Sequence, residues 1–204
     1  MSVGIVSKAT LGRLPDYLHY LNRLPADRKR ISSRVLGTAL GFSDIQVRKD
    51  LASIGGKGKP RRGYEVRQLI GRIELCISSC TSRRTVIVGA GKLGRALLDY
   101  EGFSEYGLSI AAAFDQNTAK PVKSDAGKMI YPMNAFESYC AGNDIRVGII
   151  TVPKQAAQEV CDRMLANGFA AIWSFAPTRL EVPRDFPLRE ENLALSLAHL
   201  NQSF

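Results

Sequence analysis

Apolar residues in the first eighty positions recur at three- and four-residue intervals, the spacing of helices that bury one face. This spacing predicts four helices, over about residues 8–24, from Ser32 or Ser33 to Gly41, from Ser43 or Asp44 through Leu51, and over about 65–80. The buried side of the second helix is expected to consist of Val35, Leu36, Ala39 and Leu40. Because only the turn Gly41-Phe42-Ser43 separates the two central helices, the segment predicts a helix-turn-helix.

The pattern changes near residue 85 to short apolar runs that alternate with helical segments. Predicted strands cover about 85–88, 108–114, 128–131, 147–152 and 170–175, and predicted helices cover about 93–100, 134–141 and 154–167. Strands and helices that alternate in this way predict an α/β fold with a parallel sheet. Residues 191–204 form one more predicted helix, and residues 78–82, Ser-Ser-Cys-Thr-Ser, are the expected linker between the two halves.

The third helix carries side chains that suit contact with DNA. Its apolar side is expected to consist of Ile45, Val47 and Leu51. Gln46, Arg48 and Lys49 remain for the outside. Gln and Arg hydrogen-bond the edges of bases, and Lys and Arg also contact phosphates.

A basic, glycine-rich loop follows this helix, with the sequence Gly-Gly-Lys-Gly-Lys-Pro-Arg-Arg-Gly-Tyr over residues 55–64. As a β-hairpin it would be the wing of a winged helix, where glycines permit close approach to a phosphate backbone and cations release counterions. Taken alone, the segment fits a solvated loop equally well. Together with the helix-turn-helix it favours DNA binding, with predicted contacts from Ser43, Gln46, Arg48, Lys49, Lys57, Lys59, Arg61 and Arg62.

The charge distribution agrees with a DNA-binding N-terminal half. The chain of 204 residues has a formal net charge of +9. Residues 1–80 contain 15 Lys and Arg against 6 Asp and Glu, whereas residues 81–204 contain 13 of each kind. All of the excess positive charge therefore lies in the first eighty residues, which suggests a module that meets a polyanion, joined to a neutral one.

A glycine motif follows the first predicted strand of the neutral half. Residues 89–94, Gly-Ala-Gly-Lys-Leu-Gly, fit the G-x-G-x-x-G pattern of a dinucleotide site between a strand and a helix. Asp115 ends the next strand, 21 residues after Gly94, where a carboxylate binds the adenosine ribose and favours NAD(H) over NADP(H). Thr151, Val152 and Pro153 end a later strand and are expected near the nicotinamide, or else form an ordinary strand-to-helix turn. The predicted cofactor-binding residues are Gly89, Ala90, Gly91, Lys92, Leu93, Gly94, Asp115, Thr151, Val152 and Pro153.

These patterns predict an α/β protein in three parts. A winged-helix DNA-binding domain is expected at 1–80, a Rossmann-type domain at 81–190, and a C-terminal helix at 191–204.

Composition narrows the class of protein further. A chain with 45% hydrophobic and 23% charged residues is globular, and no apolar run reaches the length that spans a bilayer. Residues 1–5 lack the pattern of a secretory signal, so a cytoplasmic location is expected. The four cysteines form no C-x-x-C pair and there are only two histidines, so free thiols and no metal site are expected.

No residue stands out as catalytic. About 120 residues supply the nucleotide fold and a tail, which leaves no room for a substrate domain. Neither His19 nor His199 lies near a predicted strand end, and Lys154 reads as a solvated lysine in the first turn of a helix. We therefore expect a sensor of NAD(H) rather than an enzyme. The alternatives are a small NAD-dependent oxidoreductase with a basic appendage and a DNA-binding protein with a vestigial cofactor site.

The chain resembles the redox-sensing transcriptional repressor (Rex) family over nearly its whole length. The matching stretches are Arg13-Leu14-Pro15-x-Tyr17, Gln46-Val47-Arg48-Lys49-Asp50-Leu51, Gly89-Ala90-Gly91-x-Leu93-Gly94-Arg95-Ala96-Leu97, Gly102-Phe103, Ala113-Phe114-Asp115, Ile150-Thr151-Val152-Pro153 and Phe175-Ala176-Pro177. The resemblance implies a cytoplasmic bacterial homodimer that binds an inverted repeat, with DNA bound in the presence of NAD+ and released by NADH. It also implies that the last helix, with Leu193 and Leu197 on an apolar stripe that includes Leu200 and Phe204, is exchanged between subunits.

The chain departs from the family pattern at two places. Similar proteins often join an arginine of the first helix, a tyrosine after the glycine loop and an aspartate of the exchanged helix in a switch network. The matching positions are His19, Tyr100 and Asn192, so the ion pair would become a neutral contact unless His19 is charged. The wing also departs from the pattern, because Lys57, Pro60, Arg61 and Arg62 stand where relatives tend to be less basic. One hypothesis is that the wing maintains or raises DNA affinity while the coupling to the NADH/NAD+ ratio is altered. The other is that the substitutions are neutral and the switch works through domain rotation regardless.

Overall fold

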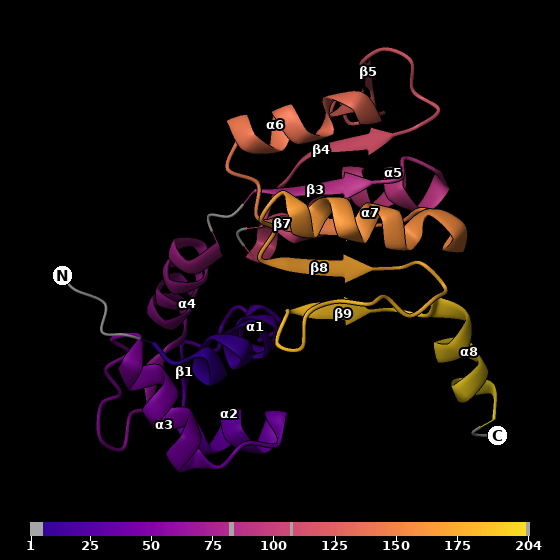
Figure 1. Ribbon diagram of the computed structural model, residues 1–204. Coiled ribbons are helices and arrows are strands. Elements are labelled where there is room, and N and C mark those ends of the chain that lie inside the picture. Colours follow the sequence, from indigo (N-terminus) through magenta and orange to yellow (C-terminus); the bar gives the residue numbers. More distant parts are fainter. Residues whose placement is uncertain (1–5, 82–83, 107, 203–204) are drawn as a thin grey trace. The chain divides into compact units, whose positions relative to one another are not determined.

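The structure, a computed structural model, describes residues 6–81, 84–106 and 108–202 (Figure 1). The chain divides into two compact units, Met1–Ser82 and Arg83–Phe204. Residues 1–5, from which the absence of a signal sequence was inferred, and Phe204 of the expected apolar stripe lie outside the described residues. In the part of the chain that is described, no helix has the length and apolar character needed to cross a bilayer.

In its described residues, 6–81, the N-terminal unit consists of four helices and a small sheet. In chain order its elements are α1 (Lys8–Asn22), β1 (Arg30–Ile31), α2 (Ser33–Leu40), α3 (Asp44–Ser53), β2 (Tyr64–Glu65) and α4 (Val66–Thr81). Serine hydroxyls cap three helices, because Ser7, Ser32 and Ser43 each accept a hydrogen bond from the backbone N–H three residues ahead. Gly41 ends α2 in the left-handed conformation, with φ +73°. Strands β1 and β2 pair antiparallel.

The core of the N-terminal unit is made by all four helices. Its fully buried side chains include Leu14 and Leu18 of α1, Leu36 of α2, Leu51 of α3 and Ile73 of α4. The two central helices form the expected helix-turn-helix, and Gly37 packs so closely on the turn that an added Cβ would lie 2.5 Å from the carbonyl oxygen of Phe42.

Three apolar residues that we expected in this core are exposed. Val35, Ala39 and Ile45 lie on the outer faces of α2 and α3. Helix α3 packs through Val47 and Leu51, and Ile45 is about 200° around the helix from Val47 at 100° per residue. The expectation was wrong because helices as short as α2 and α3, with eight and ten residues, leave the inward face ambiguous.

The expected linker at 78–82 is also wrong. The backbone remains helical through Thr81, and only Ser82 of this stretch lies outside the described residues. Buried Ile73, Cys76 and Ile77 lie on α4 just before the serines, so packing continues along the helix up to them. The turn preference of serine is weak by comparison.

The C-terminal unit contains a seven-stranded sheet in the order β5-β6-β4-β3-β7-β8-β9. Its strands are β3 (Thr85–Val88), β4 (Ile110–Asp115), β5 (Val122–Lys123), β6 (Met129–Pro132), β7 (Val147–Ile150), β8 (Ala171–Ser174) and β9 (Leu188–Glu190). All neighbours run parallel except β5, which pairs antiparallel with β6. Val88 lies beside Phe114 and Ile150, so strands β3, β4 and β7 end side by side.

Helices cover both faces of this sheet. The helical elements are α5 (Lys92–Asp99), η1 (Glu101–Tyr106), η2 (Met133–Ala135), α6 (Phe136–Gly142), α7 (Lys154–Ala166) and α8 (Leu193–Asn201). Phe114 and Ile150 pack on one face with residues of α6 and α7, whereas Ile87 and Ala113 pack on the other with Leu98 of α5. A layer of helices on each face of a parallel sheet is the arrangement of a Rossmann-type fold. The loops that follow its central strands lie at the carboxyl ends of those strands.

Helix α8 contributes nothing to either core. No residue of α8 is buried, and its leucines, Leu193, Leu195, Leu197 and Leu200, are each 50–66% exposed. An apolar helix with this much exposed surface is a candidate for contact with another chain.

Candidate functional site

The loop after β3 is a tight turn that only glycine permits. Gly89 has φ +103°, and a Cβ added there would lie 2.8–2.9 Å from atoms of Thr151 and Val152. A Cβ on Gly94 would collide with the carbonyl oxygen of Gly89. The Thr151 hydroxyl donates a hydrogen bond of 2.6 Å to that same carbonyl, which ties the turn to the end of β7. The first and third glycines of the motif therefore serve packing.

Gly91 differs from the other two glycines because it faces open space. A Cβ added to it would meet no other atom within 4 Å. Gly91 is the N-cap of α5, and no side chain caps this helix end. The N–H groups of the first turn of α5 are thus available to a negatively charged group, and the missing Cβ leaves room for its approach.

Asp115 is held in place at the end of β4. Its Oδ2 accepts a hydrogen bond of 2.7 Å from the N–H of Ala90, and its Oδ1 accepts one of 2.8 Å from the N–H of Asn117. Each carboxylate oxygen can accept a further hydrogen bond. The side chain is therefore fixed by the backbone while it keeps acceptors for a pair of ribose hydroxyls.

A cavity of about 530 Å³ lies at these strand ends. Six predicted residues line it: Gly89, Gly91, Asp115, Thr151, Val152 and Pro153. Ala90 is buried beside it, and Lys92, Leu93 and Gly94 belong to the first turn of α5 rather than to its lining. The far wall was not predicted from the sequence; it is made by Gln116, Asn117, Met133, Ala156, Glu159, Val160, Arg163, Phe175 and Pro177.

Arg163 ties this wall together. Its guanidinium donates to Oε1 of Glu137 at 2.7 and 2.9 Å and to the carbonyl oxygen of Met133 at 3.2 Å. The i, i+3, i+4, i+7 spacing of Ala156, Glu159, Val160 and Arg163 on one side of α7 was visible in the sequence, but nothing indicated that this side borders the ligand cavity.

Asp50 anchors α3 to α1 in the N-terminal unit. The Asp50 residue is 1% exposed, and its carboxylate accepts hydrogen bonds from Arg13 at 2.7 and 2.8 Å. Tyr17, Thr10 and Gln46 donate to it at 2.8, 3.0 and 3.0 Å. Burial raises the pKa of this carboxyl, but these donors more than compensate and hold its pKa below the ordinary value. Burial, together with the Asp50 carboxylate, raises the pKa of Tyr17.

The outward face of α3 carries Arg48 and Lys49, as expected, but Gln46 turns toward Asp50. Gln46, which we expected to read bases, donates its side-chain amide to Asp50. The exposed residues of α3 at helical intervals are Ile45, Arg48, Lys49 and Ala52. Arg48 forms an exposed ion pair of 3.1 Å with Asp44.

A basic groove of about 1010 Å³ runs along this face of α3. It is lined by Arg48 and Ala52 of α3, by the loop residues Gly56–Tyr64, and by Arg28, Arg30, Ile31, Ser32, Ser33 and Val35. The expected hairpin is reduced to a single bridge, in which Lys59 and Gly63 exchange backbone hydrogen bonds of 2.9 Å. Lys57, Lys59, Arg61 and Arg62 thus border one groove with Arg48. Arg28 and Arg30 join them, although they precede the helix-turn-helix and carried no sequence signal.

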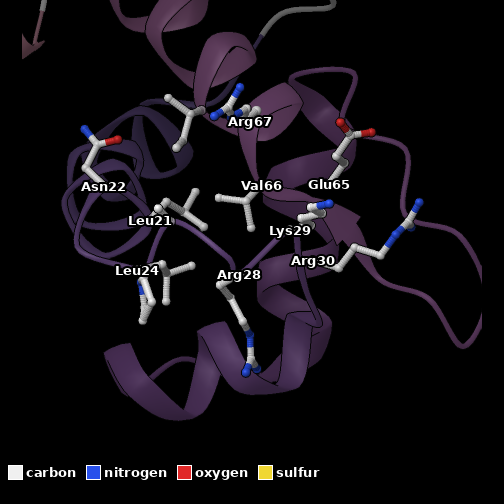
Figure 2. Close-up of a pocket in the computed structure, with 12 residues that line it drawn as sticks. Leu21, Asn22, Leu24, Arg28, Lys29, Arg30, Glu65, Val66 and Arg67 are labelled. Atoms are coloured by element: carbon white, nitrogen blue, oxygen red, sulfur yellow. The ribbon is translucent and has the colours of Figure 1, made fainter.

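A second cavity of the N-terminal unit, of about 650 Å³, has an apolar floor. Leu21, Leu24 and Val66 form this floor, and Figure 2 shows the side chains of Arg28 and Arg30 directed away from it. The cations around this cavity do not converge, so the groove beside α3 is the better candidate for a polyanion.

The three expected switch residues lie on separate elements. His19 is on α1, where Nη1 of Arg23 lies 3.2 Å from its Nε2. Tyr100 follows α5, is 58% exposed and packs edge-on against Phe103. Asn192 caps α8, because its Oδ1 accepts a hydrogen bond of 2.9 Å from the N–H of Leu195.

In the part of the chain that the structure describes, no group of three or more His, Cys, Asp or Glu residues is placed to hold a metal ion. Cys140 and Cys161 are buried, and burial raises their pKa values to about 12 and about 11. Thiols of this kind are unreactive.

Known proteins match almost the whole chain. It is 37% identical to "Redox-sensing transcriptional repressor Rex" of Clostridium perfringens over 94% of this chain and 90% of that protein. The same-named proteins of Brevibacillus brevis and Treponema denticola are 36% and 37% identical, over 96% and 92% of this chain and 95% and 90% of theirs. The chain belongs to the Rex family.

Family profiles and solved structures agree with membership of the Rex family. A profile described as "CoA binding domain" matches residues 81–178, and one described as "Putative DNA-binding protein N-terminus" matches residues 5–52. The chain is similar to "RSP in complex with beta-NAD+ and operator DNA", with a TM-score of 0.80, 36% identity, and coverage of 98% of this chain and 92% of that one. The chain is also similar to "RSP in complex with beta-NADH", with a TM-score of 0.75, 35% identity, and coverage of 98% of this chain and 94% of that one.

Proposed function

We infer that this Rex-family chain is a transcriptional repressor that binds operator DNA and responds to NAD(H), and that it is not an enzyme. The observation that carries this function is the match, over 98% of the chain, to RSP, a Rex-family repressor whose structure was determined with NAD+ and operator DNA together. The two candidate sites supply a place for each partner, one in each compact unit.

DNA is proposed to lie along the basic groove of the N-terminal unit. Arg48 and Lys49 of α3 meet the major groove, and Ser43 holds the start of that helix. The loop cations Lys57, Lys59, Arg61 and Arg62 neutralise phosphates, and Arg28 and Arg30 extend the same positive surface. Gln46 stabilises α3 by its hydrogen bond to Asp50 and does not contact a base.

NAD(H) is proposed to bind in the cavity at the strand ends of the C-terminal unit. The geometry fits a dinucleotide: Gly91 leaves room above the first turn of α5, and Asp115 presents fixed acceptors to the adenosine ribose. Thr151, Val152 and Pro153 line the side toward β7. A fixed carboxylate at this position repels a 2′-phosphate, so NAD(H) is preferred over NADP(H). NADH and NAD+ differ in their nicotinamide ring, so the bound dinucleotide would itself be the redox signal.

A homodimer is proposed to join the two activities. The exposed leucines of α8, Leu193 and Leu197 among them, would be covered by a second copy, and two DNA-binding units would then meet an inverted repeat. Substitution of Leu197 by Asp should shift the protein toward monomer in analytical ultracentrifugation. An unchanged dimer would place the interface elsewhere.

Release of DNA by NADH requires that NADH and NAD+ favour different arrangements of the dimer. His19, Tyr100 and Asn192 are the proposed contacts of this switch. His19 and Asn192 stand where similar proteins often carry charged residues. We propose that this changes the strength of the coupling to the NADH/NAD+ ratio, while NADH still weakens DNA binding. The proposed location of the protein is the cytoplasm, where both DNA and the NAD(H) pool are found.

The proposed function is tested by two measurements on the full chain. The protein should shift duplex DNA in a mobility assay, with an affinity that falls steeply as salt rises. NADH absorbance should stay constant with protein and candidate carbonyl substrates. Loss of absorbance with a substrate, and no shift of any duplex, would favour an oxidoreductase instead.

A further inference from the structure

Ile45 is an exposed apolar side chain within a charged surface. It is the second residue of α3, it is 56% exposed, and it shares one side of the helix with Arg48, Lys49 and Ala52. The fold gains little from an isoleucine there, because α3 reaches the core through Val47 and Leu51. Single exposed apolar residues are common, so exposure alone assigns Ile45 no role.

The polar groups around Ile45 are committed within the protein. The side-chain amide of Gln46 donates to Asp50, and the Ser43 hydroxyl accepts from the N–H of Gln46. Asp44 pairs with Arg48. Among these residues at the start of α3, Ile45 presents a large side chain outward without such a bond, and its chemistry is purely apolar.

We propose that Ile45 reads thymine, by packing against the C5 methyl group in the major groove. This inference rests on the proposed function. In a helix-turn-helix the N-terminal residues of the second helix meet the base edges. Among the four bases only thymine carries a methyl group in the major groove, and apolar side chains recognise it. Arg48 and Lys49, one turn further along the same face, hold this end of the helix against DNA.

The test compares thymine with deoxyuridine, which lacks only the methyl group. Duplexes with a randomised centre are first selected with the full-length wild-type chain to obtain the half-site. Each thymine is then replaced in both half-sites, and affinities are measured by fluorescence anisotropy at fixed salt. The wild-type chain is compared with Ile45→Ala and with Lys49→Gln, a matched variant on the same face of α3.

At one or two thymines of the half-site, wild-type affinity should fall about fourfold per half-site, or about sixteenfold for both, as expected for one methyl-sized group. Ile45→Ala should lose less than about twofold at those thymines by the same reasoning. Lys49→Gln should bind every duplex more weakly, but its affinity should fall as much as that of the wild type when deoxyuridine replaces those thymines. Thermal unfolding should be unchanged in Ile45→Ala, because the side chain is exposed.

The inference is overturned if the wild-type chain tolerates deoxyuridine at every position, or if Ile45→Ala loses as much as the wild type. In both cases the selected half-site still supports the proposed function. Selection that enriches no sequence contradicts sequence-specific DNA binding itself, and the inference with it.

Discussion

Arg13 and Asp50 form a two-point ion pair that joins α1 to α3. Nε of Arg13 lies 2.7 Å from Oδ2 of Asp50, and Nη2 lies 2.8 Å from Oδ1. The Asp50 side chain is 2% exposed, whereas that of Arg13 is 23% exposed. The buried carboxylate thus fixes the proposed recognition helix, α3, to α1. Its removal should lower the stability of the fold before it changes the binding of any ligand.

Replacement of Asp50 by Ala should destabilise the protein strongly. Arg13 would lose its partner, and the hydroxyls of Tyr17 and Thr10 would lose their acceptor. Removal of one partner of a buried ion pair costs about 3–5 kcal/mol. The loss should be seen in the free energy of unfolding measured by urea denaturation. The matched control is Asp44→Ala, which removes an exposed partner of Arg48 and should cost less than about 1 kcal/mol. Equal losses in the two variants would show that the buried carboxylate is no anchor.

The contribution of Asp50 to stability should disappear in acid. Its pKa is lower in the folded state than in the unfolded chain, because the donors around it outweigh burial. A lowered carboxyl pKa stabilises the fold above the unfolded value of about 3.9, and this stability is lost as pH falls through the folded value. The difference in unfolding free energy between wild type and Asp50→Asn should therefore be constant above about pH 5 and shrink below about pH 4. A difference that widens in acid would contradict this sign.

Two glycines of the same motif should respond differently to alanine. Gly94→Ala places a Cβ against the carbonyl oxygen of Gly89 and should lower the thermal stability of the C-terminal unit. Gly91→Ala meets no atom within 4 Å and should leave the fold stable within about 0.5 kcal/mol. Its methyl group would nevertheless occupy the space proposed for the pyrophosphate, so NADH affinity, measured by fluorescence titration, should fall by an order of magnitude or more. If Gly91→Ala binds NADH as tightly as the wild type does, the cofactor does not bind at this position.

Variants at the two proposed sites should separate DNA binding from the response to NADH. Arg48→Ala removes a cation that lines the basic groove and should abolish operator binding while NADH binding stays unchanged. Asp115→Ala removes the acceptor at the dinucleotide cavity and should keep DNA binding but lose release by NADH. Mobility shifts with and without NADH distinguish the two. Intact operator binding by Arg48→Ala would show that α3 is not the recognition helix.

The sequence was informative where a residue type has one dominant structural use. Serine caps, the left-handed Gly41 and the glycine motif before α5 marked the helix boundaries and the dinucleotide loop. Asp115 could be placed because it ends an apolar strand at a fixed distance from the glycines. These signals depend on local backbone geometry, which neighbours in the sequence determine.

Features that depend on long-range packing could not be predicted. The burial of Asp50 is possible only because Arg13, 37 residues earlier, supplies the counter-charge. The exposure of Ile45 follows from how α3 is turned on its neighbours, and the far wall of the cavity follows from the position of α7. Strands β5 and β9 have two and three residues, too few for a hydrophobic period.

In the proposed function, one chain links the redox state of NAD(H) to DNA binding. Fluorescence anisotropy of a labelled operator duplex, titrated with the full chain at fixed salt, measures this link directly when NADH or NAD+ is present at saturation. We expect weaker operator binding with NADH than with NAD+, because only a ligand with different affinities for the two dimer arrangements can shift them. Equal operator affinities in the two titrations, with both dinucleotides shown to bind, would contradict it.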